Sequence, residues 1–293
     1  MKGISIIIVC YKSEEHIQHL IESFIQFSDI AKNLLQFIIV DNWGFGKEDK
    51  IVRSLSQKYN SEFIYKKSGI NGGYGAGNNI GFSIAKYDIV CVVNPDVRLI
   101  SPIFNKAIRK FEDNLNLLGL SGEQQSRTRN SFFIRPEFQY PIFKELSSYA
   151  LKYTGLFSHR YMAISGAMTF YRKSLFLKVG LFDERIFLYG EESDVSIRAL
   201  KSGYDLEYYS QIKYQHLDWD LVKSSFENIN NLISSVSYYQ NKHKISCKGY
   251  FYAGILHFFI KYLLLLVKGK SNEANEAKDL IYLYKSKINK IDF

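Results

Sequence analysis

One apolar run constrains the fold more than any other part of this sequence. Residues 89–93 read Ile-Val-Cys-Val-Val without a polar side chain, and Asn94, Pro95 and Asp96 follow directly. A short run of this kind is typical of a strand buried on both faces of a parallel sheet. Pro95 cannot donate to a sheet ladder and disfavours helix at Asn94, so the strand has to end there. Ligands bind beyond the carboxyl ends of such strands, which makes Asp96 a candidate site residue, although the same three residues also form ordinary turns.

The first third of the chain alternates strand and helix patterns. The strand-like runs are residues 4–9, 37–40, 62–65 and 89–93, and helical periodicity covers residues 13–27 and 47–59 between them. Such alternation predicts an α/β fold built on a doubly wound, mostly parallel sheet. Cys10, Asp41 and Asp96 follow or end strands of this sheet, so we expect all three to face the site.

The remainder of the chain is less regular until its C-terminal part. Residues 123–160 are polar and aromatic and contain prolines, which indicates a variable loop or a substrate-facing insertion. A strand-like segment at 164–171 precedes a helical one at 172–179. Beyond Trp219 the sequence predicts three helices, near residues 220–243, 249–268 and 272–288. We therefore expect a catalytic domain over residues 1–219 and a helical extension over 220–293.

Charge and hydropathy point to a membrane surface. The net charge is +9, and residues 241–293 carry +6 of it. Within them, the apolar segment 250–267 places His257, Lys261 and Lys268 along one helical stripe, which favours a helix lying in the membrane interface. A buried core or oligomer helix and a true span are the alternatives. The basic tail could also suit nucleic acid, but no recognition motif accompanies it, so we expect no nucleic-acid partner.

Neither export nor a disulfide framework is expected. The first apolar run is too short for a signal peptide, and three scattered cysteines fit neither disulfides nor a zinc site. These features favour a cytoplasmic protein, peripheral on the inner face of the cell membrane.

A glycine-rich segment precedes the run at 89–93. Residues 71–81 hold five glycines in eleven positions, among them Gly73, together with Asn71 and Asn78. Glycines before a helix let main-chain amides approach an anion such as a diphosphate. The dinucleotide-binding pattern fits poorly, because the G-x-G-x-x-G spacing fails at Asn79 and Ile80. A purely structural glycine turn remains open.

A second acidic centre lies between residues 182 and 194. Gly190 marks a helix start, and Glu191, Glu192 and Asp194 fall in the first turn, where the helix dipole stabilises anions. A carboxylate held near a substrate hydroxyl can act as a general base. For Asp194 the sequence favours a plainer role, an i,i+4 ion pair with Arg198 on a solvated face.

Taken together, these segments resemble the family-two inverting glycosyltransferases, which have the GT-A nucleotide-sugar fold, and most closely their rhamnosyltransferase-like branch. The matching pieces are residues 5–11, 40–42, 71–81, 93–97, 180–184 and 189–194, and His216. Any one piece is weak evidence, but their order and spacing over residues 4–218 make a specific pattern.

The resemblance implies roles for individual residues. Asp41 would hold the nucleoside, Asp96 would be the last acid of the D-x-D motif that binds Mg²⁺ or Mn²⁺, and Glu192 would take the proton of the acceptor hydroxyl. His216 would complete the metal shell. The other implied donor-binding residues are Cys10, Tyr11, Asn71, Gly73, Asn78 and Asn94, and Gly166, Asp183 and Glu191 would lie on the acceptor or sugar side.

The resemblance also implies a function. The expected reaction moves rhamnose from dTDP-rhamnose onto a saccharide acceptor, lipid-linked, in bacterial-type surface polysaccharide synthesis. A UDP-sugar-dependent transferase of the same fold, galactofuranosyl or glucosyl, is the alternative within the class. A non-catalytic nucleotide-sugar-binding protein is the alternative outside it.

Overall fold

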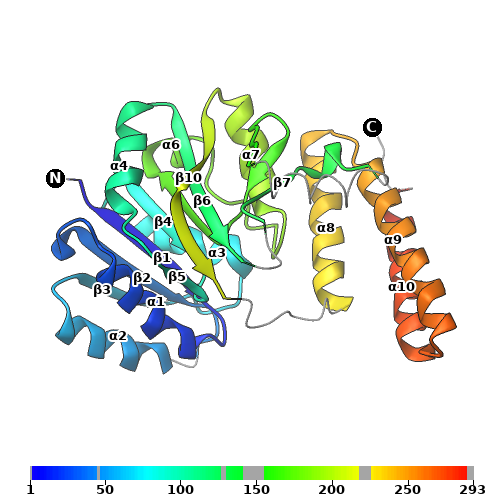
Figure 1. Cartoon of the computed structure of the whole chain (residues 1–293), viewed down its shortest axis with the longest axis horizontal. Helices are drawn as coiled ribbons and strands as arrows, with labels where there is room; N and C mark the ends of the chain where they lie inside the picture. Colours follow the sequence, from blue (N-terminus) through cyan, green and yellow to red (C-terminus); the bar gives the residue numbers. More distant parts are fainter. Residues whose placement is uncertain (1, 45–46, 127–129, 141–154, 218–225, 289–293) are drawn as a thin grey trace.

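The computed structural model describes residues 2–44, 47–126, 130–140, 155–217 and 226–288 (Figure 1). An eight-stranded sheet forms its centre, in the order β3-β2-β1-β4-β9-β6-β10-β5. Its strands are β1 (Ile4–Cys10), β2 (Leu35–Asp41), β3 (Glu62–Lys67), β4 (Ile89–Val93), β5 (Val97–Leu99), β6 (Leu117–Gln125), β9 (Met168–Arg172) and β10 (Asp205–His216). Four of the seven strand pairings among them are parallel.

The N-terminal half of the sheet confirms the fold predicted from the sequence. β3, β2, β1 and β4 pair in parallel, and the runs at 4–9, 37–40, 62–65 and 89–93 lie within these strands. β1, β2 and β4 are buried along nearly their whole length because helices cover both faces of the sheet.

The other half of the sheet adds antiparallel pairs. β9 lies antiparallel between β4 and β6, while β10 pairs in parallel with β6 and antiparallel with β5. Asn94–Asp96 thus form the turn between β4 and β5. Because His216 pairs with Val97, the end of β10 comes beside Asp96.

Helices form a layer on each face of the sheet. Ile4, Ile6 and Ile8 of β1 pack in one apolar cluster with α1 (Glu14–Gln26), α2 (Lys47–Lys58) and α4 (Phe104–Asp113). Ile7 points to the opposite face and packs in a second cluster with α3 (Gly73–Ile84), α6 (Lys173–Lys178) and α7 (Glu191–Lys201). This alternation follows from the two-residue period of side chains along a strand.

The segment predicted as an insertion holds short elements. It contains β7 (Phe132–Ile134) and η2 (Pro136–Phe138), and β7 pairs with β8 (Met162–Ile164) in a small second sheet. Its residues 127–129 and 141–154 lie outside the described part of the chain. A further short helix, η1 (Lys32–Leu34), precedes β2.

Three C-terminal helices lie where the sequence predicts them, except that residues 220–225 of the first predicted helix lie outside the described part of the chain. They are α8 (Phe226–His243), α9 (Lys248–Val267) and α10 (Ser271–Ile288). α9 and α10 form a hairpin beyond α8, far from β3 (Figure 1). A third apolar cluster joins all three helices to Ile197 of α7, so α8 packs directly on the α/β part of the molecule.

α9 combines a buried face with an exposed apolar face. Its 20 residues have the length and composition of a membrane span, and 33% of the most apolar window is buried. The exposed apolar side chains are Tyr252, Leu256, Phe259, Ile260, Leu263, Leu264, Leu266 and Val267. His257, Lys261 and Lys268 are exposed as well, on the stripe that the sequence indicates.

Candidate active site

The first candidate residues lie beyond the carboxyl ends of β1 and β2. The prediction that the Cys10 side chain faces the site is wrong, because this side chain is fully buried in the first apolar cluster. Burial raises the pKa of its thiol. Its carbonyl oxygen accepts a hydrogen bond from Asn42 N at 2.9 Å. Tyr11 is exposed, and its ring meets the Trp43 ring edge-on at 5.1 Å between centroids. This aromatic pair borders the strand ends where a nucleoside is expected.

Asp41 organises the loop that carries Trp43. Its Oδ1 accepts hydrogen bonds from Trp43 N at 2.8 Å and from Gly44 N at 2.7 Å, and its Oδ2 accepts one from Tyr65 Oη at 2.6 Å. The carboxylate is fully buried. Asp41 therefore fixes the main chain beside β2 and presents the loop, a role beyond the direct nucleoside contact that the resemblance implies.

The glycine-rich segment is packed tightly against its neighbours. Gly73 has a φ of +88°, and a Cβ there would lie 2.0 Å from the carbonyl oxygen of Phe187, so only glycine fits. Asn42 Nδ2 donates to Gly73 O at 2.9 Å, and Gly73 N donates to Asn71 Oδ1 at 3.2 Å. Asn78 is fully buried and donates to Tyr74 O. Gly73 and Asn78 are thus structural parts of the segment, while Asn71 is exposed at its edge.

Asp96 and His216 come together although 120 residues separate them. His216 Nε2 lies 3.0 Å from the Asp96 carboxylate, and Leu217 N donates to Asp96 O at 3.0 Å. The His216 side chain is buried, whereas Asp96 and Asn94 are half-buried at the turn after β4. Carboxylate and imidazole are both ligands of divalent metals.

Asp96 and His216 alone are too few ligands for a complete metal site. Within the described residues, no group of three or more His, Cys, Asp or Glu side chains converges on one point. Asp96 and His216 fit as two ligands of a Mg²⁺ or Mn²⁺ ion, and the oxygens of a diphosphate would be the natural source of further ligands.

Glu192 occupies the first turn of α7, at the wall of a pocket of about 440 Å³ that also borders Asn94 and His216. Gly166 N donates to Glu192 Oε1 at 3.1 Å, and a Cβ on Gly166 would lie 2.5 Å from the same oxygen. Tyr74 Oη donates to Gly166 O at 2.7 Å, which ties α3 to this loop. Burial raises the pKa of Glu192, and hydrogen bonds from main-chain N–H groups oppose the change.

Glu191 lines the same pocket but is more deeply buried. Its Oε1 has no hydrogen-bond partner among the described residues. Burial, and then the neighbouring charge of Glu192, raise the pKa of Glu191 well above its ordinary value. The two adjacent acids are therefore not equivalent: Glu191 favours the neutral form more strongly.

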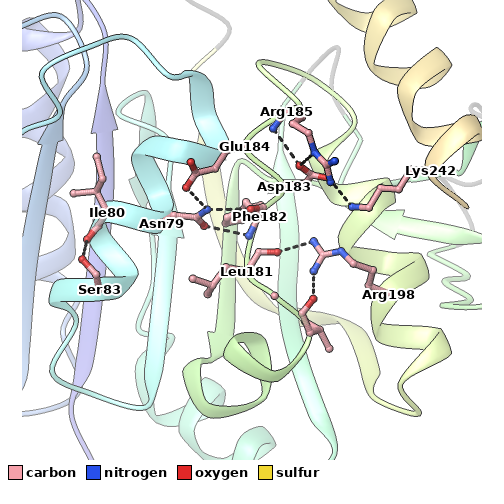
Figure 2. A pocket seen from close by; sticks show the side chains of 12 residues that line it. Asn79, Ile80, Ser83, Leu181, Phe182, Asp183, Glu184, Arg185, Arg198 and Lys242 are labelled. Atoms are coloured by element: carbon pink, nitrogen blue, oxygen red, sulfur yellow. Dashed lines mark hydrogen bonds and ion pairs between the residues drawn. The ribbon is translucent and has the colours of Figure 1, made fainter.

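Two further acids differ from the sequence-based picture. Asp183 lines a different pocket, of about 840 Å³, where Arg185 and Lys242 bind its carboxylate (Figure 2). Tyr238 Oη also donates to this carboxylate. Asp194 pairs with Arg198 as expected, but the prediction of a solvated face is wrong, because Asp194 is fully buried. Helix α8 covers this face, and sequence periodicity within α7 alone cannot reveal that.

Sequence reasoning missed several residues that shape the site. Trp43 and Tyr65 surround Asp41, while Lys242 and His243 of α8 reach the segment before and within α7. Trp43 directly follows the matching residues 40–42, so its place in the sequence could have identified it as a site residue. The α8 residues gave no local signal, because their partners lie about 50 residues away in the chain.

Comparison with known proteins identifies the family. The sequence profile described as "Glycosyl transferase family 2" matches residues 5–180, which is more than half of the chain. The chain belongs to glycosyl transferase family 2. The match ends before α7, so Glu192, His216 and the C-terminal helices lie outside it. A search of the curated proteins found no match.

Solved structures share the fold at low sequence identity. S. aureus TarS residues 1–349 in complex with UDP is 18% identical, with a TM-score of 0.52 over 80% of this chain and 65% of that one. The mannosyltransferase PcManGT from Pyrobaculum calidifontis, in complex with GDP-Man and Mn²⁺, is 10% identical, with a TM-score of 0.61 over 98% and 87% of the two chains. GalNAc-T7 with UDP, GalNAc and Mn²⁺ is 13% identical, with a TM-score of 0.60 over 80% and 48%. These likenesses confirm the GT-A-like fold, and this chain spans less than two thirds of the length of TarS and GalNAc-T7.

Proposed function

We propose that this protein is a divalent-metal-dependent, inverting glycosyltransferase that moves a sugar from a nucleotide donor onto a saccharide acceptor. The observation that carries the proposal is the convergence of Asn94, His216 and Glu192 on one pocket next to Asp96. Family membership supports the reaction class, because glycosyl transfer is what the family's name describes.

The donor would lie across the strand ends of the sheet. The Tyr11–Trp43 pair would take the base, with Asp41 fixing the loop, and the glycine-rich segment would border the diphosphate. Asp96 and His216 would hold the metal, and a bound divalent cation supplies charge neutralisation for the departing diphosphate.

Glu192 would act as the general base. In a single displacement, the acceptor oxygen forms a bond to the anomeric carbon as the bond from that carbon to the diphosphate oxygen breaks. Glu192 accepts the acceptor's hydroxyl proton, and the nucleoside diphosphate leaves with inversion at the carbon. The raised pKa of Glu192 suits proton transfer near neutral pH better than an ordinary carboxylate would.

For the transferred sugar we propose rhamnose from dTDP-rhamnose. The support is Asn94-Pro95-Asp96, a form of the metal motif common in the rhamnosyltransferase-like branch that the sequence resembles. UDP-sugars are the second candidate class, since two neighbours of the same fold were solved with UDP. A donor-hydrolysis screen over dTDP-, UDP- and GDP-sugars decides between them.

For the acceptor we propose a lipid-linked saccharide at the inner face of the cell membrane, within surface polysaccharide synthesis. The exposed apolar face of α9 and its exposed lysines support a peripheral, interfacial position. One face of α9 already packs on α10, and Lys261 lies mid-helix, which disfavours a span. In this proposal residues 1–219 perform the chemistry and α9 and α10 of residues 220–293 contact lipid.

The test compares Glu192→Gln with Asp96→Ala. Glu192→Gln is expected to bind nucleoside diphosphate and Mn²⁺ normally while turnover falls about 10²-fold or more, because the amide cannot accept the proton. Asp96→Ala is expected to lose the metal-stimulated part of donor binding. Calorimetry with dTDP or UDP, with and without Mn²⁺, and a transfer assay measure both. Near-normal transfer by Glu192→Gln would overturn the base assignment, and a wild-type protein that binds nucleotide without any turnover would favour the non-catalytic alternative.

A further inference from the structure

Helix α8 presents one face to the segment that leads into α7. Ser235, Tyr238 and Lys242 follow at intervals of three and four residues, which places them along one side of the helix, and His243 lies next to Lys242 at the edge of this side. Ser235 Oγ donates to Leu188 O at 3.1 Å, and Tyr238 Oη donates to Asp183 Oδ2 at 2.7 Å. Lys242 bridges Asp183 and Asp194 (Figure 2 shows its bond to Asp183). A single helix face thus contacts the loop before Glu192 and the helix that carries it.

The strongest of these contacts converge on Asp194. Its fully buried carboxylate lies 2.5 Å from Lys242 Nζ and 2.7 Å from His243 Nε2, and it accepts a bond from Arg198 Nε at 2.8 Å. Burial alone would raise the pKa of Asp194, but these partners outweigh burial and lower it, so the group is ionised. A buried ion of this kind is stable only while its partners stay in place.

Arg198 extends this network to the loop before α7. Its Nη2 donates to the carbonyl oxygen of Leu181 (Figure 2), and its Nη1 donates to that of Val179. Leu181 and Tyr189 both have positive φ, at 57° and 67°, which is unfavourable for residues with a Cβ. Such conformations persist where the surroundings fix them, and α8 contacts this loop at Asp183 and Leu188, between the two residues of positive φ.

A second set of contacts ties α8 to α7 from another side. Tyr239 Oη donates to Glu137 Oε2 at 2.9 Å, Glu137 forms an ion pair with Arg135 at 2.9 Å, and Arg135 donates to Ser196 Oγ at 3.3 Å. The side chains of Arg135 and Glu137 are nearly fully buried. Asp194 and Ser196 lie two and four residues after Glu192, so α8 constrains α7 through both.

We propose that Lys242 and His243 are positioning residues for Glu192, and that α8 is therefore a working part of the active site rather than a mere extension. This inference rests on the proposed role of Glu192 as the base. Both side chains act through Asp194: they fix the first turn of α7, and with it the Glu192 carboxylate against Gly166 N. Lys242 and His243 lie outside the region that the family profile matches.

The test is Lys242→Met, with Lys244→Met as the matched control. Lys244 is exposed and has no ion pair among the described residues, so its replacement removes the same charge without touching Asp194. Lys242→Met is expected to lower kcat about 10- to 100-fold while the donor KM and nucleoside diphosphate binding stay unchanged, because only the base is displaced. Lys242→Arg, which can still bridge Asp183 and Asp194, is expected to recover most of kcat. Lys244→Met should behave as wild type.

Two results would overturn the proposal. One is an unchanged kcat in Lys242→Met. The other is a parallel loss of kcat, donor binding and melting temperature, which indicates a structural role only. Measuring Glu192→Gln beside these variants distinguishes a failure of the positioning role of Lys242 from a failure of the base role of Glu192. If Glu192→Gln is inactive and Lys242→Met is fully active, the base assignment survives and the positioning role fails; if Glu192→Gln is active, the proposed base fails first.

Discussion

At the residue scale, three acidic side chains at the start of α7 differ because their partners differ. Asp194 is fully buried, and its contacts with His243, Arg198 and Lys242 outweigh burial and lower its pKa. Glu191 is almost as deeply buried, and burial, followed by the neighbouring charge of Glu192, raises its pKa well above the ordinary value. Glu192, half-buried and bound by Gly166 N, lies between these extremes. The helix dipole favours anions at all three positions, and burial and partners decide which of them is an anion.

This difference gives a testable pH dependence of stability. The pKa of Glu191 is higher in the folded than in the unfolded protein, so the folded state binds the proton more tightly. Its contribution to stability is therefore full below the unfolded pKa of about 4.3 and is lost as pH rises through the folded pKa. The side chain in Glu191→Gln is neutral at every pH in this range. We therefore expect Glu191→Gln to melt at a higher temperature than wild type at pH 8, and at the same temperature as wild type near pH 4.

Thermal melts of wild type and Glu191→Gln across this pH range measure the effect. Glu276→Gln, at an exposed position of α10, is the control and should follow the wild-type curve throughout. Parallel curves for Glu191→Gln and wild type would mean that folding does not raise the pKa of Glu191.

At the element scale, the sequence predicts those elements whose signals are local. The parallel strands read as uninterrupted apolar runs because both their faces are covered, and the three C-terminal helices follow helical periodicity. The antiparallel half of the sheet escaped prediction because β9 is defined by pairing with β4 and β6, which precede it by about 50 to 80 residues. The meeting of Asp96 and His216 depends on the same kind of pairing, between β5 and β10. The resemblance identifies both residues as metal ligands, but their proximity follows from the strand register, which the sequence does not give.

The packing of α9 on α10 includes a close approach at one glycine. Gly254 lies against the buried ring of Tyr284, and a Cβ there would lie 2.1 Å from Tyr284 Cε1. The ring would have to move, so we expect Gly254→Ala to destabilise the hairpin by about 1–3 kcal/mol. Hydrogen exchange of the amides in α9 and α10 measures this, and donor binding should stay unchanged.

Two further variants check the mechanism of this effect. Leu256→Ala changes an exposed side chain of the same helix and should leave the exchange rates of the hairpin near those of wild type. Gly254→Ala combined with Tyr284→Leu removes the clash, so the double variant should be less destabilised than the sum of the single ones. Additive losses would mean that the ring does not oppose the new methyl group.

At the scale of the whole molecule, the sheet and the α9–α10 hairpin lie at opposite ends, with α8 between them (Figure 1). In the proposed arrangement, α9 contacts lipid while α8, packed on α7, joins it to the helix that carries Glu192. A lipid-linked acceptor would then reach a base whose position depends on the same helical region. Membrane docking and base positioning are thus proposed properties of neighbouring helices in one apolar cluster.

The membrane proposal predicts that charge on the exposed apolar face of α9 abolishes docking. Phe259 and Leu263 are exposed one helical turn apart, and replacing both by glutamate introduces two anions where acyl chains would lie. We expect wild type to float with anionic liposomes in a density gradient, and Phe259→Glu/Leu263→Glu to stay at the bottom while binding nucleoside diphosphate normally. Leu115→Glu, at an exposed leucine before β6, is the matched control and should float.

Each lysine near the surface contributes about 1 kcal/mol, screened by salt, so wild-type flotation should weaken as salt is added. Flotation of the α9 variant as efficiently as wild type would show that another surface binds lipid, and failure of wild type to float would reject the membrane proposal while leaving the assignments of Asp96 and Glu192 untouched.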